Sequence, residues 1–332
     1  MCPCDEVLSA MPYAPSGISV VAEDLAGMRS QAFGLAEYVA LPTRFHSVQA
    51  TGLLHRCLPS SLWPHPLRAL SQKPDPLHDD LVFSVAGKGG AVGAAMRRSG
   101  RHVVQIQNPR IRSDRFDLVI ANYHDEIEGP NVLLSRTALH GLTAAKLAEA
   151  RARWRDRLNV SGRPLLAVLV GGANGRFRFG REEAESFADR LASVARRTGA
   201  NLFITTSRRT APEATAVLRD AVESVRGTLW SGGDDNPYRG LIACADWLIV
   251  TADSVSMVSE AVASAAPVYV QRLPGKSRRI GLFLETLEKC GRIRMFEGEL
   301  EHWPVQPLDD TPIVAGEMCQ RLGLKTLFRG SE

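Results

Sequence analysis

The stretch that most constrains the fold is the segment from Asp246 to Leu273, DWLIVTADSVSMVSEAVASAAPVYVQRL. Its first part, Trp247 to Val250, is short and continuously apolar, as a parallel strand buried on both faces is. Short polar residues follow, then apolar residues at helical spacing, and Pro267 ends that helix before a second apolar run, Val268 to Val270. A strand, a polar turn, a helix and a second strand predict a βαβ unit of a parallel sheet.

The polar turn of this unit has the composition of an anion-binding site. Short polar side chains suit a helix N-cap, and the free N–H groups and positive dipole end behind such a cap attract phosphate. The spacing of the apolar residues places Glu260 inside the helix that follows. The candidate binding residues of the turn are Asp253, Ser254, Val255 and Ser256.

The segment SVSMVSEAVASAAPVYV, at positions 254–270, resembles the nucleotide-sugar segment of GT-B glycosyltransferases. In those enzymes a turn of small residues meets the diphosphate of the donor, and a helix glutamate holds the ribose hydroxyls. The resemblance therefore implies that Glu260 binds ribose.

Four further motifs extend the resemblance over nearly the whole chain. They are HDEIEGPNVL, TTSRRTAP, NPYRG and VTADSVSMVSEA, and together they are similar to the ELM1 family, named for a plant mitochondrial fission factor and common in bacteria. That family resembles GT-B proteins in fold. The resemblance implies an α/β protein with two Rossmann-like domains facing a cleft, with the donor nucleotide held by the C-terminal domain.

The chain of 332 residues is long enough for two domains of about 150 residues each. A charged helical segment ends at residue 158, and the loop after it marks the expected boundary. We predict a disordered leader over 1–15, an N-terminal acceptor domain over 16–158, a C-terminal donor domain over 159–311, and a C-terminal helix over 312–332, which in GT-B proteins crosses back to the first domain.

The strongest candidate for a general base follows the predicted strand at 116–121. Open α/β sheets place their ligands at the carboxyl ends of strands. Imidazole titrates near neutrality and a neighbouring carboxylate raises its basicity, so His124 and Asp125 are the predicted catalytic residues. A histidine at a strand end often only bonds a neighbouring backbone group, and this alternative stays open.

Glycine clusters follow two of the predicted strands. The run from Gly87 to Gly90 matches neither the dinucleotide nor the P-loop pattern, so it favours a tight turn before a helix at 91–98 over close contact with an acceptor. Gly171 and Gly172 follow the strand at 165–170 and resemble the glycine-rich loop of GT-B donor domains, where bare backbone lets a phosphate come close.

Cations and one aromatic side chain complete the predicted donor site. Two adjacent arginines after a strand suit bidentate phosphate binding, although a solvated charge pair is an equal alternative. Four cations between positions 272 and 279 lie where a leaving nucleoside diphosphate needs positive charge. Tyr238 either stacks on the base or is a surface aromatic. The remaining binding candidates are Ser207, Arg208, Asn236, Tyr238, Lys276 and Arg279.

Net charge and cysteine usage restrict the classes of partner and metal site that we expect for this chain. A net charge of +4 without a long basic run favours anionic small molecules or a membrane surface over nucleic acid. No apolar run reaches the roughly 18 residues that span a bilayer, and no signal-peptide pattern is evident, so we expect a cytoplasmic protein with an option of peripheral contact at the inner membrane face. Six cysteines without CxxC spacing argue against a zinc site, and we expect no metal and no cofactor.

These observations favour a metal-independent GT-B-type glycosyltransferase. Its co-substrate would be a nucleotide-diphosphate sugar. Its acceptor would be a hydroxyl group, and a lipid-linked acceptor is one option. The reaction would then belong to bacterial envelope glycan or glycolipid synthesis. The alternative is a non-catalytic adaptor that retains the GT-B shell and binds a partner protein, as the fission name implies.

Overall fold

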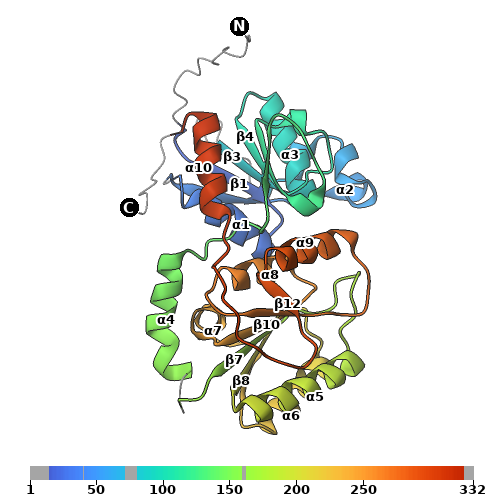
Figure 1. Cartoon of the computed structure of the whole chain (residues 1–332). Helices are drawn as coiled ribbons and strands as arrows, with labels where there is room; N and C mark the ends of the chain where they lie inside the picture. The colour runs from blue at the N-terminus through green and yellow to red at the C-terminus, as the bar shows by residue number, and fades with distance from the viewer. Residues whose placement is uncertain (1–14, 40, 72–80, 159–161, 325–332) are drawn as a thin grey trace. The chain divides into compact units, whose positions relative to one another are not determined.

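The computed structural model describes residues 15–39, 41–71, 81–158 and 162–324. The chain divides into two compact units, which Figure 1 shows in one colour sequence from blue to red. The first comprises Met1–Ser135, Leu139–Gly141 and Asp310–Glu332, and the second comprises Arg136–Ala138 and Leu142–Asp309. The predicted leader lies, apart from Pro15, outside the described residues.

The first unit contains a six-stranded parallel sheet in the order β2-β1-β3-β4-β5-β6. Crossover connections between the strands return each one to the same direction, as parallel pairing requires. Its strands are β1 (Ile18–Ala22), β2 (Thr43–Ser47), β3 (Leu81–Val85), β4 (Val103–Ile106), β5 (Leu118–Asn122) and β6 (Val132–Ser135). Its helices are α1 (Ala26–Ala36), α2 (Gly52–Cys57), α3 (Ala86–Arg98) and α10 (Thr311–Leu322), with short 3₁₀ turns η1 (Ser60–Leu62), η2 (Pro66–Ala69), η3 (Ser113–Arg115) and η4 (Tyr123–Asp125).

The second unit repeats this architecture with the strand order β12-β11-β10-β7-β8-β9, again all parallel. Its strands are β7 (Leu165–Val170), β8 (Asn201–Thr206), β9 (Thr228–Trp230), β10 (Trp247–Thr251), β11 (Val268–Gln271) and β12 (Ile293–Met295). Its helices are α4 (Ala144–Leu158), α5 (Arg181–Thr198), α6 (Pro212–Glu223), α7 (Tyr238–Cys244), α8 (Val255–Val262) and α9 (Arg278–Lys289).

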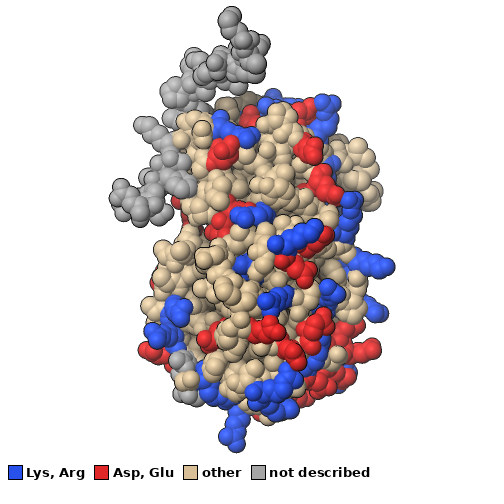
Figure 2. All heavy atoms as spheres, in the orientation of Figure 1, with Lys and Arg blue, Asp and Glu red and all other residues tan. Residues whose placement is uncertain are grey.

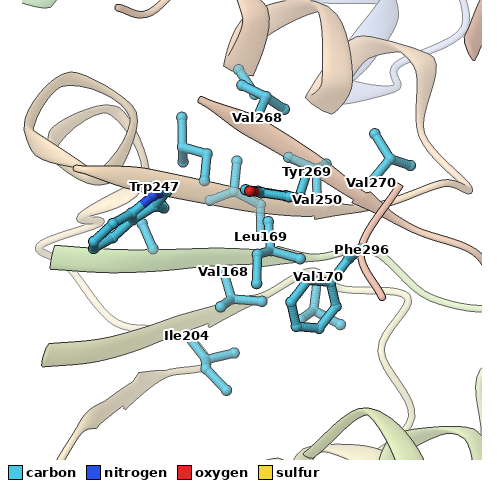
Figure 3. Packing of buried hydrophobic residues seen from close by; sticks show 14 of the residues in the cluster. Val168, Leu169, Val170, Ile204, Trp247, Val250, Val268, Tyr269, Val270 and Phe296 are labelled. Atoms are coloured by element: carbon cyan, nitrogen blue, oxygen red, sulfur yellow. The ribbon is translucent and has the colours of Figure 1, made fainter. Parts of the chain in front are cut away.

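Buried aliphatic side chains form the core of the second unit. Every residue of β7 and β10 is buried, which explains why these strands read as continuous apolar runs rather than as alternating ones. Figure 3 shows side chains of β7, β8, β10 and β11 packing together with Phe296. The predicted fold class, an α/β protein with two Rossmann-like sheets, is confirmed.

Charged side chains of both signs are scattered over the face seen in Figure 2. Figure 2 shows lysine and arginine interspersed with aspartate and glutamate over the visible face. This mixture agrees with the small net charge of +4. Among the helices of the described residues, none is both long and apolar enough to cross a bilayer.

The structure departs from the predicted boundaries in two places. The division between the units falls before α4, so this charged helix belongs to the second unit and not to the first, as the boundary at 158 implied. The glycine run at 87–90 lies inside α3, not in a turn before it. A Cβ at Gly89 would lie 2.5 Å from the carbonyl oxygen of Val21, so glycine lets α3 pack directly on β1.

Candidate functional site

Four loops of the second unit meet at the carboxyl edge of its sheet. They follow β7, β8, β10 and β11, whose parallel directions bring their ends together. The N–H of Gly171 donates to Oγ1 of Thr251 at 2.7 Å, and Oγ of Ser207 donates to the carbonyl of Gly171 at 2.8 Å. The side-chain amide of Asn174 donates to the carbonyl of Asp253 at 2.9 Å. The N–H of Arg178, in the loop after β7, also donates to the carbonyl of Pro274, after β11, at 2.9 Å, so the four loops are joined into one surface.

The carboxylate of Asp253 is the centre of this loop cluster, and its side chain is 0% exposed. It accepts hydrogen bonds from the Gly172 N–H at 3.1 Å and from the Thr251 hydroxyl at 2.7 Å. The guanidinium of Arg209 lies 2.7 Å from the same carboxylate. A buried charge is stable only when it is paired and hydrogen-bonded, and this one is both. Asp253 thus holds the loops together, and any phosphate at this turn is left to the backbone N–H groups beyond it.

The two predicted glycines of the loop after β7 are required for the packing of this loop against its neighbours. A Cβ at Gly171 would overlap the carboxylate of Asp253. A Cβ at Gly172 would overlap the backbone carbonyl of Arg209. Their lack of a side chain is used for loop-to-loop packing, so their presence alone does not indicate a phosphate ligand.

Two helices start side by side at this edge, each with a serine N-cap. Oγ of Ser254 accepts from the Met257 N–H at 3.3 Å at the start of α8, and Oγ of Ser277 accepts from the Ile280 N–H at 3.4 Å at the start of α9. The strands that lead into them, β10 and β11, are neighbours in the sheet. The first turn of α8 carries Val255 and Ser256, both partly exposed. Free N–H groups and two helix dipoles therefore face this edge.

The predicted cations divide into engaged and available side chains. Arg209 is taken up by Asp253, whereas its neighbour Arg208 is exposed. In the described part of the chain, the side chains of Arg208 and Lys276 make no hydrogen bond or ion pair. Arg279 lies in the first turn of α9 and is partly buried. Arg208 follows β8, and Lys276 and Arg279 both follow β11, so two strand ends of the same sheet edge carry positive charge.

Glu260 and Tyr238, predicted separately, lie together in the structure. The hydroxyl of Tyr238 donates to Oε2 of Glu260 at 2.6 Å. Burial, together with the charge of Glu260, raises the pKa of the Tyr238 hydroxyl well above its ordinary value, so the tyrosine keeps its proton. The N–H of Tyr238 in turn donates to Oδ1 of Asn236 at 3.0 Å.

A cavity of about 440 Å³ is lined in part by Tyr238, whereas Glu260 is not among its lining residues. One wall comes from α4, where Arg153 contacts Asp235 at 2.8 Å, and the other comes from the start of α7. Its lining includes Trp154, Asn236 and Tyr238. The Trp154 ring is buried, with the guanidinium carbon of Arg157 lying 4.2 Å from its centroid. The amide of Asn236 and the carboxylates of the lining are the polar groups that a planar ligand such as a nucleobase would contact there.

The predicted catalytic residues lie in the first unit, in the turn η4 that follows β5. The backbone N–H of Asn122 donates to Oδ2 of Asp125 at 3.3 Å, so this carboxylate caps its own turn. His124 is 4% exposed and Asp125 is also buried, while the adjoining Tyr123 is 54% exposed. The strand end places His124 and Asp125 where the sequence predicted them, but only Tyr123 of this turn projects into solvent.

Sequence reasoning missed the role of the residues that hold the loops together, although it had considered one of them, Arg209, as a phosphate ligand. They are Asn174, Arg209, Thr210 and Thr251, and each bonds a group on a different loop. The signal that could have found them is the short polar run directly after each buried strand, as in TTSRRT and VTADS. Within the described ranges, no group of three or more His, Cys, Asp or Glu side chains is placed to hold a metal ion.

Comparisons with known proteins agree with this architecture. The family model described as mitochondrial fission ELM1 matches residues 26–322. The mitochondrial fission protein ELM1 of Arabidopsis thaliana is 31% identical over 250 residues, which is 67% of this chain and 58% of the plant protein. The chain thus spans less than two thirds of the length of that relative.

Two solved structures have a similar fold at low sequence identity. The UDP-GlcNAc 2-epimerase of Neisseria meningitidis, described as bound to UDP-GlcNAc, has a TM-score of 0.52 at 12% identity and covers 91% of this chain and 99% of its own. MurG of Acinetobacter baumannii has a TM-score of 0.50 at 13% identity, covering 93% of this chain and 92% of its own.

Proposed function

The chain belongs to the mitochondrial fission ELM1 family, with a GT-B-like fold, and on that basis we propose that it is a glycosyltransferase whose second unit binds a nucleoside-diphosphate sugar. The sugar would pass to a hydroxyl acceptor held by the first unit. The sequence resemblance to the family is thereby confirmed, and the activity is our proposal.

One observation carries the proposal: a single helix, α8, presents a serine-capped N-terminus and a half-buried carboxylate on the same element. From Val255 to Glu260 the helix rises about 7.5 Å. A diphosphate at the N-terminus and a ribose alongside the first turns can therefore contact one rigid element at once. Tyr238 fixes one oxygen of that carboxylate, which orients it before any ligand arrives.

The roles of the other residues follow from their positions. The backbone N–H groups of Val255 and Ser256 would bind the diphosphate at the start of α8. Arg208, Lys276 and Arg279 would balance its charge and that of the leaving nucleoside diphosphate. The base would enter the cavity beside Asn236 and Trp154.

The acceptor would be activated in the first unit. His124 or Asp125 would take the proton of its hydroxyl group, which requires the buried turn η4 to expose one of them to the acceptor. No metal ion is assigned a role, because arginine and lysine side chains and two helix N-termini already supply positive charge at the donor edge.

A calorimetric titration of the full chain with UDP- and GDP-sugars tests the proposal. The UDP-sugar comes first because a protein of similar fold is described as bound to UDP-GlcNAc. We expect saturable binding that the corresponding free nucleoside diphosphate competes away. A chain that binds no nucleotide sugar overturns the proposal.

A second function, that of a non-catalytic adaptor, is favoured by a different observation. Several groups at the donor edge already satisfy one another, since Asp253 neutralises Arg209 and the two loop glycines pack against neighbouring loops. The plant relative is named as a mitochondrial fission protein, not as an enzyme. An adaptor would bind its partner protein equally well when Glu260 or His124 is replaced, whereas an enzyme would lose turnover.

A further inference from the structure

Helix α2 of the first unit is inverted relative to the usual pattern, because it buries a histidine and exposes leucines. Leu53 and Leu54 are 76% and 58% exposed, whereas His55 is buried. The His55 ring stacks on Trp63 with 4.6 Å between the ring centroids, and its Nε2 donates to the carbonyl of Pro64 at 2.8 Å. These contacts fix which face of α2 points inward, so the leucines are held outward.

Two more leucines extend this exposed apolar surface along the chain. Leu62 on η1 is 65% exposed, and Leu67 on η2 is also exposed. Both turns pack against α3, which places them on one side of the first unit. In the described residues, four of the eight exposed large apolar side chains thus fall within positions 53–67. Leucine side chains in water are unfavourable, and a cluster of them usually marks a contact surface.

Unpaired arginines adjoin the leucines. Arg68, Arg98 and Arg115 are exposed, and their side chains make no hydrogen bond or ion pair within the described part of the chain. Of the described residues that line the cavity beside Arg98 and Arg115, the two acids are already engaged, Asp117 with Arg97 at 3.0 Å and Asp114 with Arg112. This side of the unit therefore combines apolar side chains with an excess of positive charge.

Two adjacent cavities show the same combination. One, of about 580 Å³, is lined mainly by apolar groups, among them Leu67, Leu70 and Met96. The other, of about 570 Å³, is lined by five arginines. The two share Arg98 and Arg101. An apolar hollow joined to an arginine-lined one fits a molecule with an acyl chain and an anionic head group.

We propose that Leu53, Leu54, Leu62 and Leu67, together with Arg68, Arg98 and Arg115, form a docking surface for an anionic lipid bilayer, here named the leucine–arginine surface. The leucines enter the acyl region and the arginines meet lipid phosphates, each basic side chain adding to the attraction of an anionic leaflet. Leucines that stand free of their neighbours suit a fluid partner, whereas a folded protein partner requires a fixed complementary surface.

Vesicle co-sedimentation of the full chain, without any nucleotide sugar, tests this inference separately from the proposed activity. We expect binding to vesicles of phosphatidylcholine with phosphatidylglycerol, weak binding to phosphatidylcholine alone, and a loss of binding as salt is raised. The double variant Leu53→Ser/Leu54→Ser should weaken binding about tenfold or more. Arg98→Gln and Arg115→Gln should each weaken it about fivefold and flatten the salt dependence.

Matched controls come from other parts of the chain. Ile313→Ser removes an equally exposed apolar side chain from α10, and Arg196→Gln removes an exposed cation from α5. Both should bind vesicles like the wild type. Equal losses in the control and test variants would overturn the lipid assignment. So would a fall in the thermal midpoint of Leu53→Ser/Leu54→Ser larger than the lower helix propensity of serine explains, because it would show that the protein itself covers these leucines.

Two competitors distinguish the source of the anion. If glycerol phosphate displaces the chain from vesicles and the leucine variants bind vesicles like the wild type, the surface is instead a site for a free phosphate compound. A wild-type chain that ignores vesicles but binds polyglutamate through Arg98 and Arg115 would show that the partner is an acidic protein surface, and the lipid inference would be wrong.

Discussion

The Tyr238 hydroxyl and the Glu260 carboxylate, 22 positions apart in the sequence, form a hydrogen bond of 2.6 Å in the second unit. The raised pKa of the tyrosine means that its hydroxyl keeps the donated proton to a higher pH than an ordinary tyrosine does. This hydrogen bond links the start of α7 to the middle of α8, and so it connects the cavity beside Asn236 with the helix that begins at Ser254.

Replacing Glu260 by glutamine tests ribose binding. The amide oxygen can still accept from Tyr238, so the fold should keep its thermal midpoint. Nucleotide binding should weaken by about 1.5 to 3 kcal/mol, the range for hydrogen bonds to a charged group. Calorimetric titration of both proteins measures the difference, with Glu182→Gln on α5 as a control that should change nothing. Equal affinities would remove Glu260 from the site, and a large loss of stability would make it a structural residue.

Replacing Tyr238 by phenylalanine should change how stability depends on pH. The pKa of the tyrosine is raised in the folded chain, while in the unfolded chain it lies near 10. As the pH rises past about 10, the unfolded chain releases this proton first, so the wild-type free energy of unfolding falls by up to about 1.4 kcal/mol per pH unit. The phenylalanine variant lacks this contribution. We expect urea unfolding from about pH 9 to about pH 11 to show that the free energy of unfolding of the variant rises relative to that of the wild type. A difference between the two proteins that does not change with pH contradicts the prediction.

Arg208 and Arg209 should behave oppositely despite being neighbours. Arg209→Ala leaves the buried Asp253 carboxylate without its cation, and the free energy of unfolding should fall by about 2 kcal/mol. Arg208→Ala removes an exposed side chain, so stability should stay within about 0.5 kcal/mol. Nucleotide-diphosphate affinity should fall in the Arg208 variant. Denaturant unfolding and calorimetry on both proteins separate the two roles, and reversed results would contradict the assignment.

Glycine-to-alanine changes should distinguish packing from helix propensity. Gly171→Ala would force its new methyl group against Asp253, and the free energy of unfolding should fall by about 3 kcal/mol. Gly281→Ala in α9 meets nothing within 4 Å and should stabilise the chain by up to about 1 kcal/mol. Thermal melts of the two variants provide the measurement. If Gly171→Ala melts like the wild type, the loops are looser than described.

His124→Ala tests the proposed general base. Turnover should fall by about 10²- to 10⁴-fold, and kcat/KM should lose its acidic limb, while nucleotide affinity is kept because the donor site lies in the other unit. Since His124 is buried, His124→Gln serves as a second variant that leaves a smaller cavity. Turnover that survives both changes but disappears in Asp125→Asn would make the carboxylate the base.

The parts of the fold that the sequence predicted are those set by local pattern. The apolar run at Leu165–Val170 ends at a glycine, and β7 has those same bounds because burial on both faces leaves no room for polar residues. The short strands β6 and β12 were missed, because four-residue and three-residue strands carry little signal. The helix α6 was also missed, although Pro212 at its start and the spacing of Ala214, Leu218 and Val222 are typical of an amphipathic helix.

The parts that could not be predicted depend on contacts between distant segments. The sequence assigned Gly89 to a turn, because only the packing of α3 on β1 shows why a helix needs glycine there. It grouped Asp253 with phosphate ligands, because the pairing of Asp253 with Arg209 spans two loops. Likewise, nothing in the letters GLLHRC indicates that α2 faces inward with His55 instead of with its leucines. Each of these outcomes is decided by tertiary geometry.

The packing of Gly171 and Gly172 has a consequence for the study of relatives. A family member that has lost all enzymatic activity would still need both glycines, because alanine at either position collides with the neighbouring loop. Retention of the glycine-rich loop is therefore a poor diagnostic of an active member. Surveys that sort the family into enzymes and degenerate forms should instead follow Arg208, Tyr238 and Glu260. The loss of these side chains would lower the stability of the fold little but would strongly weaken ligand binding.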